Sequence, residues 1–171
     1  MLVFNFQNKK QVAVWIIVIL AVLLGAGTWA SSWKVKYVVD GDTIVVQKGR
    51  QESTIRLLGI DAPEIAHEKY GKTKGDCYGK EATDFLKEEI GGQNVVLLED
   101  PNAGDKDKYG RSLRYVLADG KIINAEMVRN GYAFVYQYSD FFFAKWFYSM
   151  EKQAKNERLG LWGKTCQYYF K

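Results

Sequence analysis

Three short runs rich in β-branched and aromatic residues follow one another between residues 33 and 60, and only turn sequences separate them. The runs are residues 33–39, 43–47 and 53–60, with Asp-Gly-Asp in the first turn and Lys-Gly-Arg-Gln in the second. Such runs are typical of strands, and connections this short join antiparallel neighbours. The sequence therefore predicts a three-stranded meander.

The remainder of the chain mixes helical and strand patterns. Apolar residues at helical spacing predict helices over residues 80–90, 123–130 and 141–159, each followed by glycine. Two further strands are expected at residues 94–99 and 111–117. Three strands, a helix, two strands and two helices fit an α+β domain on a five-stranded β-barrel, for which an OB-fold is the leading candidate.

The N-terminal region carries a different pattern. Residues 12–30 contain no charged side chain and follow Lys9 and Lys10. Their most apolar part has the length of a signal peptide, and the whole run approaches the roughly 20 residues that span a bilayer. We expect residues 1–32 to form a hydrophobic helix that is either a cleaved signal peptide or a membrane anchor, with a buried core helix as the alternative, and residues 33–171 to form the folded domain.

The chain has two cysteines, Cys77 and Cys166, far apart in sequence and without metal-ligand spacing. In an exported chain such a pair indicates one disulfide, and two unrelated free thiols are the alternative. A disulfide would place the domain outside the cytoplasm, in a protein that is secreted, periplasmic or membrane-anchored.

Composition excludes several kinds of chemistry. Lys9 and Lys10 are two of the 24 bases, so the other 22 face 20 acids, and this small excess does not by itself indicate nucleic acid. The only histidine is His67, so a histidine base cannot be combined with histidine metal ligands. If the cysteines are bonded, thiol nucleophiles and zinc sites are excluded too. Any chemistry must use carboxylates, arginines, hydroxyls and water.

Four acids are expected to converge. Asp40 and Asp42 precede the second predicted strand, and Asp61 and Glu64 follow the third. In a hairpin, the start of one strand lies beside the end of the other. Four carboxylates in a small volume repel one another unless a cation intervenes, and an oxygen-only ligand set favours calcium. The alternative, aspartates that cap turns, accounts for the first pair alone.

Two arginines lie close to these acids in sequence. Arg56 is within the third predicted strand, and Arg111 begins the last one. A guanidinium group binds phosphate oxygens through two parallel hydrogen bonds and keeps its charge. Two of them beside a metal are suited to stabilising a phosphoryl transition state, whereas structural salt bridges to the nearby acids are the alternative.

Four motifs, DGDT at 40–43, IRLLGIDAPE at 55–64, YGKEA at 78–82 and DKYGRSLRYV at 107–116, resemble the thermonuclease, or staphylococcal nuclease, family. The resemblance covers about residues 35–162. It implies an OB-fold barrel with three helices that cleaves single- and double-stranded DNA and RNA, leaves 3′-phosphates and uses Ca²⁺. No protein partner is inferred, and a monomer is expected; membrane contact is expected only through an uncleaved N-terminal segment.

The resemblance also implies roles for acidic residues. Asp42 and Asp61 match the calcium-binding carboxylates, and Ala62 matches a position that offers its backbone carbonyl to the ion. Asp40 matches a nearby acid that orients water beside the metal. Glu64 matches the carboxylate assigned as general base.

Further matched residues would bind the substrate. Arg56 and Arg111 match phosphate-binding arginines, and Lys108 and Tyr109 match residues that contact the terminal phosphate of the bound nucleotide. Two tyrosines of the family's base pocket align with Tyr136 and Tyr138 if one residue is deleted before them. Core packing is expected for the aromatic residues of the last helix, with a membrane or protein contact as the alternative.

Two functions of other classes compete with hydrolysis. One is a non-catalytic nucleic-acid-binding barrel, and the other is a calcium-stabilised surface protein whose acids serve structure only. The complete set of acids and arginines favours the enzyme, because degenerate copies of a catalytic domain usually lose one or more of them.

Overall fold

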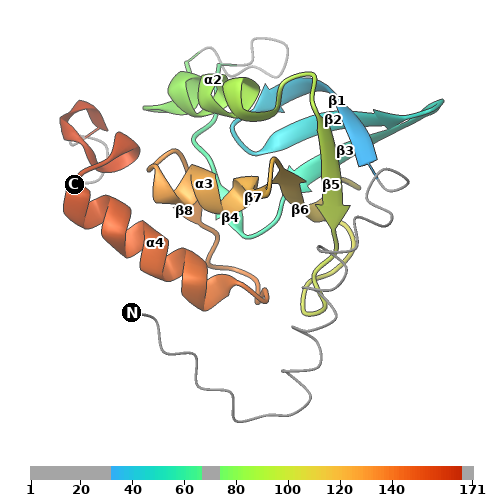
Figure 1. Cartoon of the computed structure of the whole chain (residues 1–171). Coiled ribbons are helices and arrows are strands. Elements are labelled where there is room, and N and C mark those ends of the chain that lie inside the picture. Colours follow the sequence, from blue (N-terminus) through green and yellow to red (C-terminus); the bar gives the residue numbers. More distant parts are fainter. Residues whose placement is uncertain (1–31, 67–73, 167–171) are drawn as a thin grey trace. The chain divides into compact units, whose positions relative to one another are not determined.

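A closed five-stranded barrel forms the centre of the computed structural model, which describes residues 32–66 and 74–166 (Figure 1). Its strands are β1 (Ser32–Asp40), β2 (Thr43–Lys48), β3 (Gln51–Leu57), β5 (Asn94–Leu98) and β6 (Ser112–Ala118). Antiparallel pairing joins β3 to β2, β2 to β1, β1 to β5 and β5 to β6. A parallel pairing of β3 with β6 closes the barrel, which confirms the predicted meander and is consistent with an OB-fold.

Side chains alternate along β3 between the interior of the barrel and its outer face. Ile55 and Leu57 are 1% and 0% exposed, and Arg56 between them points to the opposite face of the strand. Arg56 pairs in register with Thr43, the first residue of β2. The strand pattern therefore places a guanidinium beside the turn that joins β1 to β2.

Three helices pack around the barrel (Figure 1). They are α2 (Gly79–Ile90), α3 (Ile123–Arg129) and α4 (Ala144–Glu157). Helix α2 lies against β1 and buries residues at helical spacing, while α3 contacts both β6 and α4. The three helices confirm the sequence prediction, although the last one begins three residues later than predicted. Two short 3₁₀ turns, η3 (Gly160–Trp162) and η4 (Lys164–Cys166), follow α4.

The predicted third strand is wrong at its C-terminal end. It stops at Leu57, and after a turn the chain forms β4 (Ile60–Asp61), which pairs with β8 (Phe134–Val135) instead of the barrel. Gly59 has a φ of +79°, and a Cβ there would lie 2.7 Å from the Phe141 ring. The chain bends at Gly59 because only glycine fits this conformation under the ring. A two-residue strand, β7 (Lys121–Ile122), was also not predicted.

A disulfide joins Cys77, before α2, to Cys166, at the end of η4, across 89 residues of sequence. The predicted pairing is confirmed, and the alternative of two free thiols is wrong. Cys166 is fully buried, so the bond attaches the loop before α2 to the interior of the C-terminal turns.

The N-terminal hydrophobic helix expected within residues 1–32 lies outside the described residues, apart from Ser32, which begins β1. Across residues 32–66 and 74–166, no helix has the length and apolar character required to cross a membrane.

Asp100 forms hydrogen bonds with three parts of the fold: the turn that follows it, strand β6 and the residues before α4. One carboxylate oxygen accepts hydrogen bonds from the backbone N–H groups of Asn102 and Ala103, at 2.7 and 3.1 Å. The other accepts from the Tyr115 hydroxyl at 2.5 Å and from the Phe142 N–H at 2.7 Å. Burial opposes ionisation, but these hydrogen bonds outweigh it and hold the pKa of Asp100 below its ordinary value. The bond to Phe142 also fixes the residues that precede α4.

We predict that Asp100→Asn lowers the free energy of unfolding by about 1–3 kcal/mol at neutral pH, because an amide nitrogen replaces one of the two acceptor oxygens and cannot accept the two hydrogen bonds made to it. A depressed folded-state pKa contributes stability above the unfolded value, and that contribution is lost as pH falls through the folded value. The difference between wild type and variant should therefore shrink below about pH 4. Urea unfolding at neutral pH and below about pH 4 measures the difference in unfolding free energy between wild type and variant. Asp119→Asn, an exposed substitution, is the control. A difference of the same size at the two pH values would show that the Asp100 charge does not stabilise the fold.

Candidate active site

The turn between β1 and β2 is packed too tightly to accept a side chain at its centre. A Cβ on Gly41 would lie 2.7 Å from the Ala62 Cβ and 2.9 Å from the Ala82 Cβ. The turn is thus pressed against both the segment after β4 and helix α2. Asp40 and Asp42, on either side of Gly41, are consequently brought next to the segment that carries Asp61 and Glu64, as the sequence predicted.

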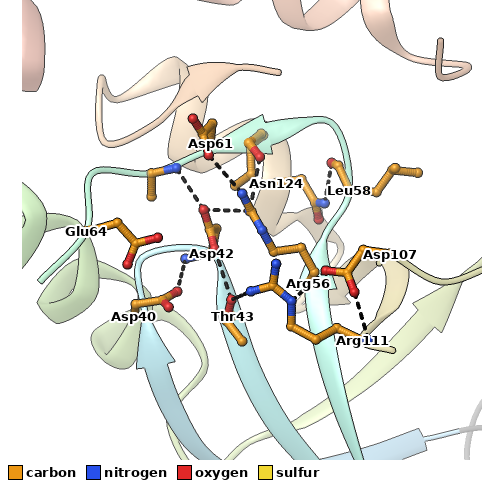
Figure 2. A network of polar contacts seen from close by, with 12 residues as sticks. Asp40, Asp42, Thr43, Arg56, Leu58, Asp61, Glu64, Asp107, Arg111 and Asn124 are labelled. Atoms are coloured by element: carbon orange, nitrogen blue, oxygen red, sulfur yellow. Dashed lines mark hydrogen bonds and ion pairs between the residues drawn. The ribbon is translucent and has the colours of Figure 1, made fainter. Parts of the chain in front are cut away.

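Asp42 is the buried centre of the site, with 3% of its surface exposed. Its carboxylate accepts hydrogen bonds from the Thr43 hydroxyl at 3.0 Å and the Ala62 N–H at 2.8 Å, and forms an ion pair with Arg56 at 2.5 Å (Figure 2). Burial raises the pKa of Asp42 above its ordinary value, the charge of Arg56 opposes this rise, and the neighbouring Asp40 adds to it. This environment favours positive charge beside the carboxylate.

Arg56 lies between two carboxylates. Its Nη1 also donates to the Ile60 carbonyl at 3.1 Å, and its Nη2 donates to Asp61 at 2.9 Å. The Arg56 side chain is 13% exposed, so its orientation is restricted by these partners. Arg56 thereby ties the end of β3 to β4 and to the turn before β2.

Arg111 is held by a different acid and joins the same network. Its Nε donates to the Asp107 carboxylate at 2.6 Å, and that carboxylate also accepts the N–H groups of Tyr109 and Arg111. Burial opposes ionisation of Asp107, but the bonds from Arg111 outweigh it and lower the pKa. Arg111 Nη1 donates to the Thr43 hydroxyl at 3.2 Å, so Thr43 connects Arg111 with Asp42 (Figure 2).

Glu64 is exposed and lies in the stretch between β4 and α2. Figure 2 shows its side chain on the same side of the network as Asp40 and Asp42. Asp40 is buried and accepts the Asp42 N–H at 3.0 Å, which fixes the turn. The four acids named by the sequence therefore gather at one end of the barrel.

A pocket of about 360 Å³ opens beside the two arginines. Its walls combine aliphatic side chains with basic and aromatic ones: Arg56, Leu57, Leu58, Gly59, Ile60, Asp107, Lys108, Tyr109, Arg111, Leu113, Tyr136, Tyr138 and Ser139. The predicted substrate-binding residues thus share one pocket. The tyrosines Tyr136 and Tyr138 lie edge to face, with ring centroids 5.5 Å apart. Through Arg56, the pocket is connected to the carboxylates of Asp42 and Asp61.

The family model described as "Staphylococcal nuclease homologue" matches residues 54–164. The chain belongs to the staphylococcal nuclease family. The matched range includes Arg56, Asp61, Glu64 and Arg111, whereas Asp42 lies before it and is connected to them by the contacts of its carboxylate.

Several proteins are similar to this member of the staphylococcal nuclease family. A thermonuclease of Staphylococcus hyicus is 33% identical over 77% of this chain and 75% of its own length. An uncharacterised endonuclease of Escherichia coli O157:H7 is 37% identical over 75% of each chain. An uncharacterised protein of Bacillus anthracis is 38% identical over 75% of this chain, and the match spans 59% of that relative.

The proposed ligands all offer oxygen atoms, which are the donors that a hard cation such as Ca²⁺ prefers. Asp42 and Asp61 offer carboxylate oxygens, and a calcium ion takes six to eight oxygen ligands, which water and phosphate also supply. Among residues 32–66 and 74–166, no group of three or more Asp, Glu, His or Cys side chains converges as a ligand cluster. The contact between Ala62 and Asp42 is made by the Ala62 N–H, whereas the sequence comparison implied a role for its carbonyl.

Three residues of this staphylococcal nuclease site were not singled out from the sequence. Thr43 lies inside the DGDT motif and Asp107 inside the DKYGR motif, so these motifs could have identified both as residues of the site. Asn124 lies outside every motif. Its buried amide donates to the Leu58 and Arg114 carbonyls at 2.9 and 3.1 Å, which fixes the bend between Arg56 and Asp61.

We predict that Thr43→Val lowers the free energy of unfolding by about 1–3 kcal/mol, because it removes a donor from the buried Asp42 carboxylate and an acceptor from Arg111. Thr43→Ser keeps the hydroxyl and serves as the matched control, with a loss of less than about 1 kcal/mol. Urea denaturation of both variants gives the comparison. Equal stability of the valine and serine variants would show that the hydroxyl does not connect the network.

Proposed function

We propose that this protein is a calcium-dependent nuclease that hydrolyses phosphodiester bonds in DNA and RNA and leaves 3′-phosphate ends. Arg56 supports this function most strongly, because it lines the pocket and at the same time pairs with two carboxylates. A phosphate in the pocket would meet Arg56 and Arg111, with the acids directly behind them. Membership of the staphylococcal nuclease family supports the same conclusion.

The proposed metal ligands are the carboxylates of Asp42 and Asp61 and the backbone carbonyl of Ala62. A bound Ca²⁺ would neutralise charge on the scissile phosphate as a Lewis acid. The buried position of Asp42 supports this assignment, because a buried carboxylate is stabilised by added positive charge. Asp40 fixes the turn through the Asp42 N–H and is proposed to orient water near the ligands.

The chain's own groups would perform the hydrolysis. Glu64 accepts a proton from the attacking water, and its exposure leaves it accessible to that water. The water oxygen forms the new bond to phosphorus as the P–O5′ bond breaks, and the leaving 5′-oxygen takes a proton from solvent. Arg56 and Arg111 donate to the non-bridging phosphate oxygens, where charge develops in the transition state. Arg111 is preoriented for this by Asp107, and Arg56 by the Ile60 carbonyl.

Substrate binding is proposed for the remaining pocket residues. Lys108 would contact a terminal phosphate; it lies 5.0 Å from the centre of the Tyr109 ring, which is largely exposed. Tyr136 and Tyr138 would stack against a base, an interaction worth roughly 1–3 kcal/mol per base and tolerant of sequence. Stacking and phosphate contacts do not depend on the sugar, so DNA and RNA are both proposed as substrates.

An extracytoplasmic location is proposed for the domain, either secreted, periplasmic or tethered to a membrane by residues 1–32. The Cys77–Cys166 disulfide supports this, because disulfides persist in oxidising compartments.

We expect the purified protein to hydrolyse single-stranded DNA with calcium and to lose that activity in excess chelator. The substrate is a labelled oligonucleotide, and end-group analysis of the products should find 3′-phosphates. Restoring calcium should restore the rate. Negligible hydrolysis with and without calcium, together with DNA binding, would instead favour the non-catalytic binding barrel.

We also predict that Arg56→Lys lowers kcat for DNA hydrolysis by about 10²-fold or more, because an ammonium group cannot replace the two-pronged guanidinium. Arg114→Lys is a closely matched control: Arg114 is 14% exposed and pairs with Glu99 and Asp105, as Arg56 is 13% exposed and pairs with two acids. Arg114 does not line the pocket. If both lysine variants lose activity equally, Arg56 serves structure only.

A further inference from the structure

We propose that Asp76 is a positioning residue for Glu64, and that the Cys77–Cys166 disulfide holds Asp76 in place. The inference rests on the nuclease function proposed above, in which Glu64 is the general base. Glu64 is exposed and lies outside any helix or strand, so its position depends on contacts with other segments.

Asp76 and Glu64 are joined by two reciprocal contacts. The Asp76 carboxylate accepts the Glu64 N–H at 3.2 Å, and the Asp76 N–H donates to the Glu64 carbonyl at 2.8 Å. Both polar groups of the Glu64 backbone are thus held by one residue. Because Glu64 belongs to no helix or strand, no sheet or helix ladder holds this backbone instead.

The backbone around Asp76 lies directly against Glu64. A Cβ on Gly79 would be 2.4 Å from the Glu64 carbonyl oxygen, and one on Gly75 would be 3.2 Å from the same atom. The approach at Gly79 is one that a side chain would prevent, and a Cβ at Gly75 would make a tight contact with the same carbonyl. Residues 75–79 and the Glu64 backbone therefore form one packed unit, and a displacement of the first displaces the second.

The disulfide anchors this unit at Cys77, the residue after Asp76. Its partner Cys166 is fully buried, and so is Leu161 in the preceding turn. The Leu161 N–H donates to the Gly131 carbonyl at 2.8 Å, which attaches the C-terminal turns to the end of α3. The covalent bond thus connects residues 75–79, which pack against Glu64, with buried residues of the C-terminal turns that are far away in sequence.

A second anchor lies on the other side of Cys77. The Tyr78 ring stacks on Tyr132 with centroids 5.6 Å apart, and Tyr78 adopts a φ of +72°. This contact holds the start of α2. Asp76, however, precedes Cys77, so the disulfide is the anchor nearer to the residue that contacts Glu64. We therefore expect loss of the disulfide to affect Asp76 more than the helix.

The first test compares Asp76→Ala with Asp76→Asn in the full chain, using calcium-dependent DNA hydrolysis. Asp76→Ala removes the acceptor for the Glu64 N–H and should lower kcat about tenfold or more with KM nearly unchanged, since Glu64 acts in the chemical step. Asp76→Asn keeps a side-chain carbonyl acceptor and should recover most of kcat. Asp84→Ala, an exposed substitution on α2, is the control. Wild-type kcat in Asp76→Ala overturns the proposal.

The second test asks whether the disulfide acts through Asp76. Cys77→Ser/Cys166→Ser should lower kcat in the same direction, measured well below the unfolding temperature. Adding Asp76→Ala to this variant should cost less than it does in wild type, because coupled residues are not additive. Independent, multiplicative losses overturn the role of the disulfide. If the double-serine variant does not fold, wild type and Asp76→Ala are each assayed before and after reduction of the disulfide by a dithiol. Asp76→Ala should then lower kcat less in the reduced proteins than in the oxidised ones.

Failure of the nuclease function is distinguishable from failure of this inference. If wild type does not hydrolyse DNA, the proposed function fails, and amide hydrogen exchange still tests the contact. The Glu64 N–H should exchange slowly in wild type and at least tenfold faster in Asp76→Ala and in the disulfide-free variant. Unchanged exchange in both variants overturns the positioning role whatever the activity.

Discussion

The buried carboxylate of Asp42 is the interaction on which the site depends. It stands in the turn immediately before β2 and is bonded to Thr43, to the Ala62 backbone and to Arg56, so a single side chain connects two strands with the segment after β4. A buried carboxylate is costly unless donors and positive charge surround it. Arg56 supplies that charge where the turn before β2 meets the segment after β4, and the same arrangement brings a guanidinium to the wall of the pocket.

Arg56 separates two parts of the site, the carboxylates of Asp42 and Asp61 and the pocket. Acids lie behind Arg56, while the pocket in front of it carries Arg111, Lys108 and aromatic rings. Thr43 links the sides, because its hydroxyl accepts from Arg111 and donates to Asp42. Metal and phosphate would then be held by one continuous network, in which moving either arginine alters the surroundings of the acids. Such a network favours a preorganised transition-state site over independent salt bridges.

The sequence predicted the parts of the fold that depend on local periodicity. Five strands, three helices and the disulfide follow from residue spacing, turn residues and cysteine number, and the hairpin geometry predicted that Asp42 and Asp61 converge. The end of β3 could not be predicted, because the bend at Gly59 depends on the Phe141 ring, distant in sequence. Asn124 was missed for a related reason: a buried amide that holds the Leu58 carbonyl leaves no pattern in its own neighbourhood.

A crystal structure of the full chain grown with Ca²⁺ and a nucleoside 3′,5′-bisphosphate would show whether one network holds both metal and phosphate. We expect a calcium ion bound by the Asp42 and Asp61 carboxylates, a phosphate contacting Arg56 and Arg111, and the base beside Tyr136 and Tyr138. A calcium ion away from Asp42, or a phosphate bound without either arginine, would contradict this expectation.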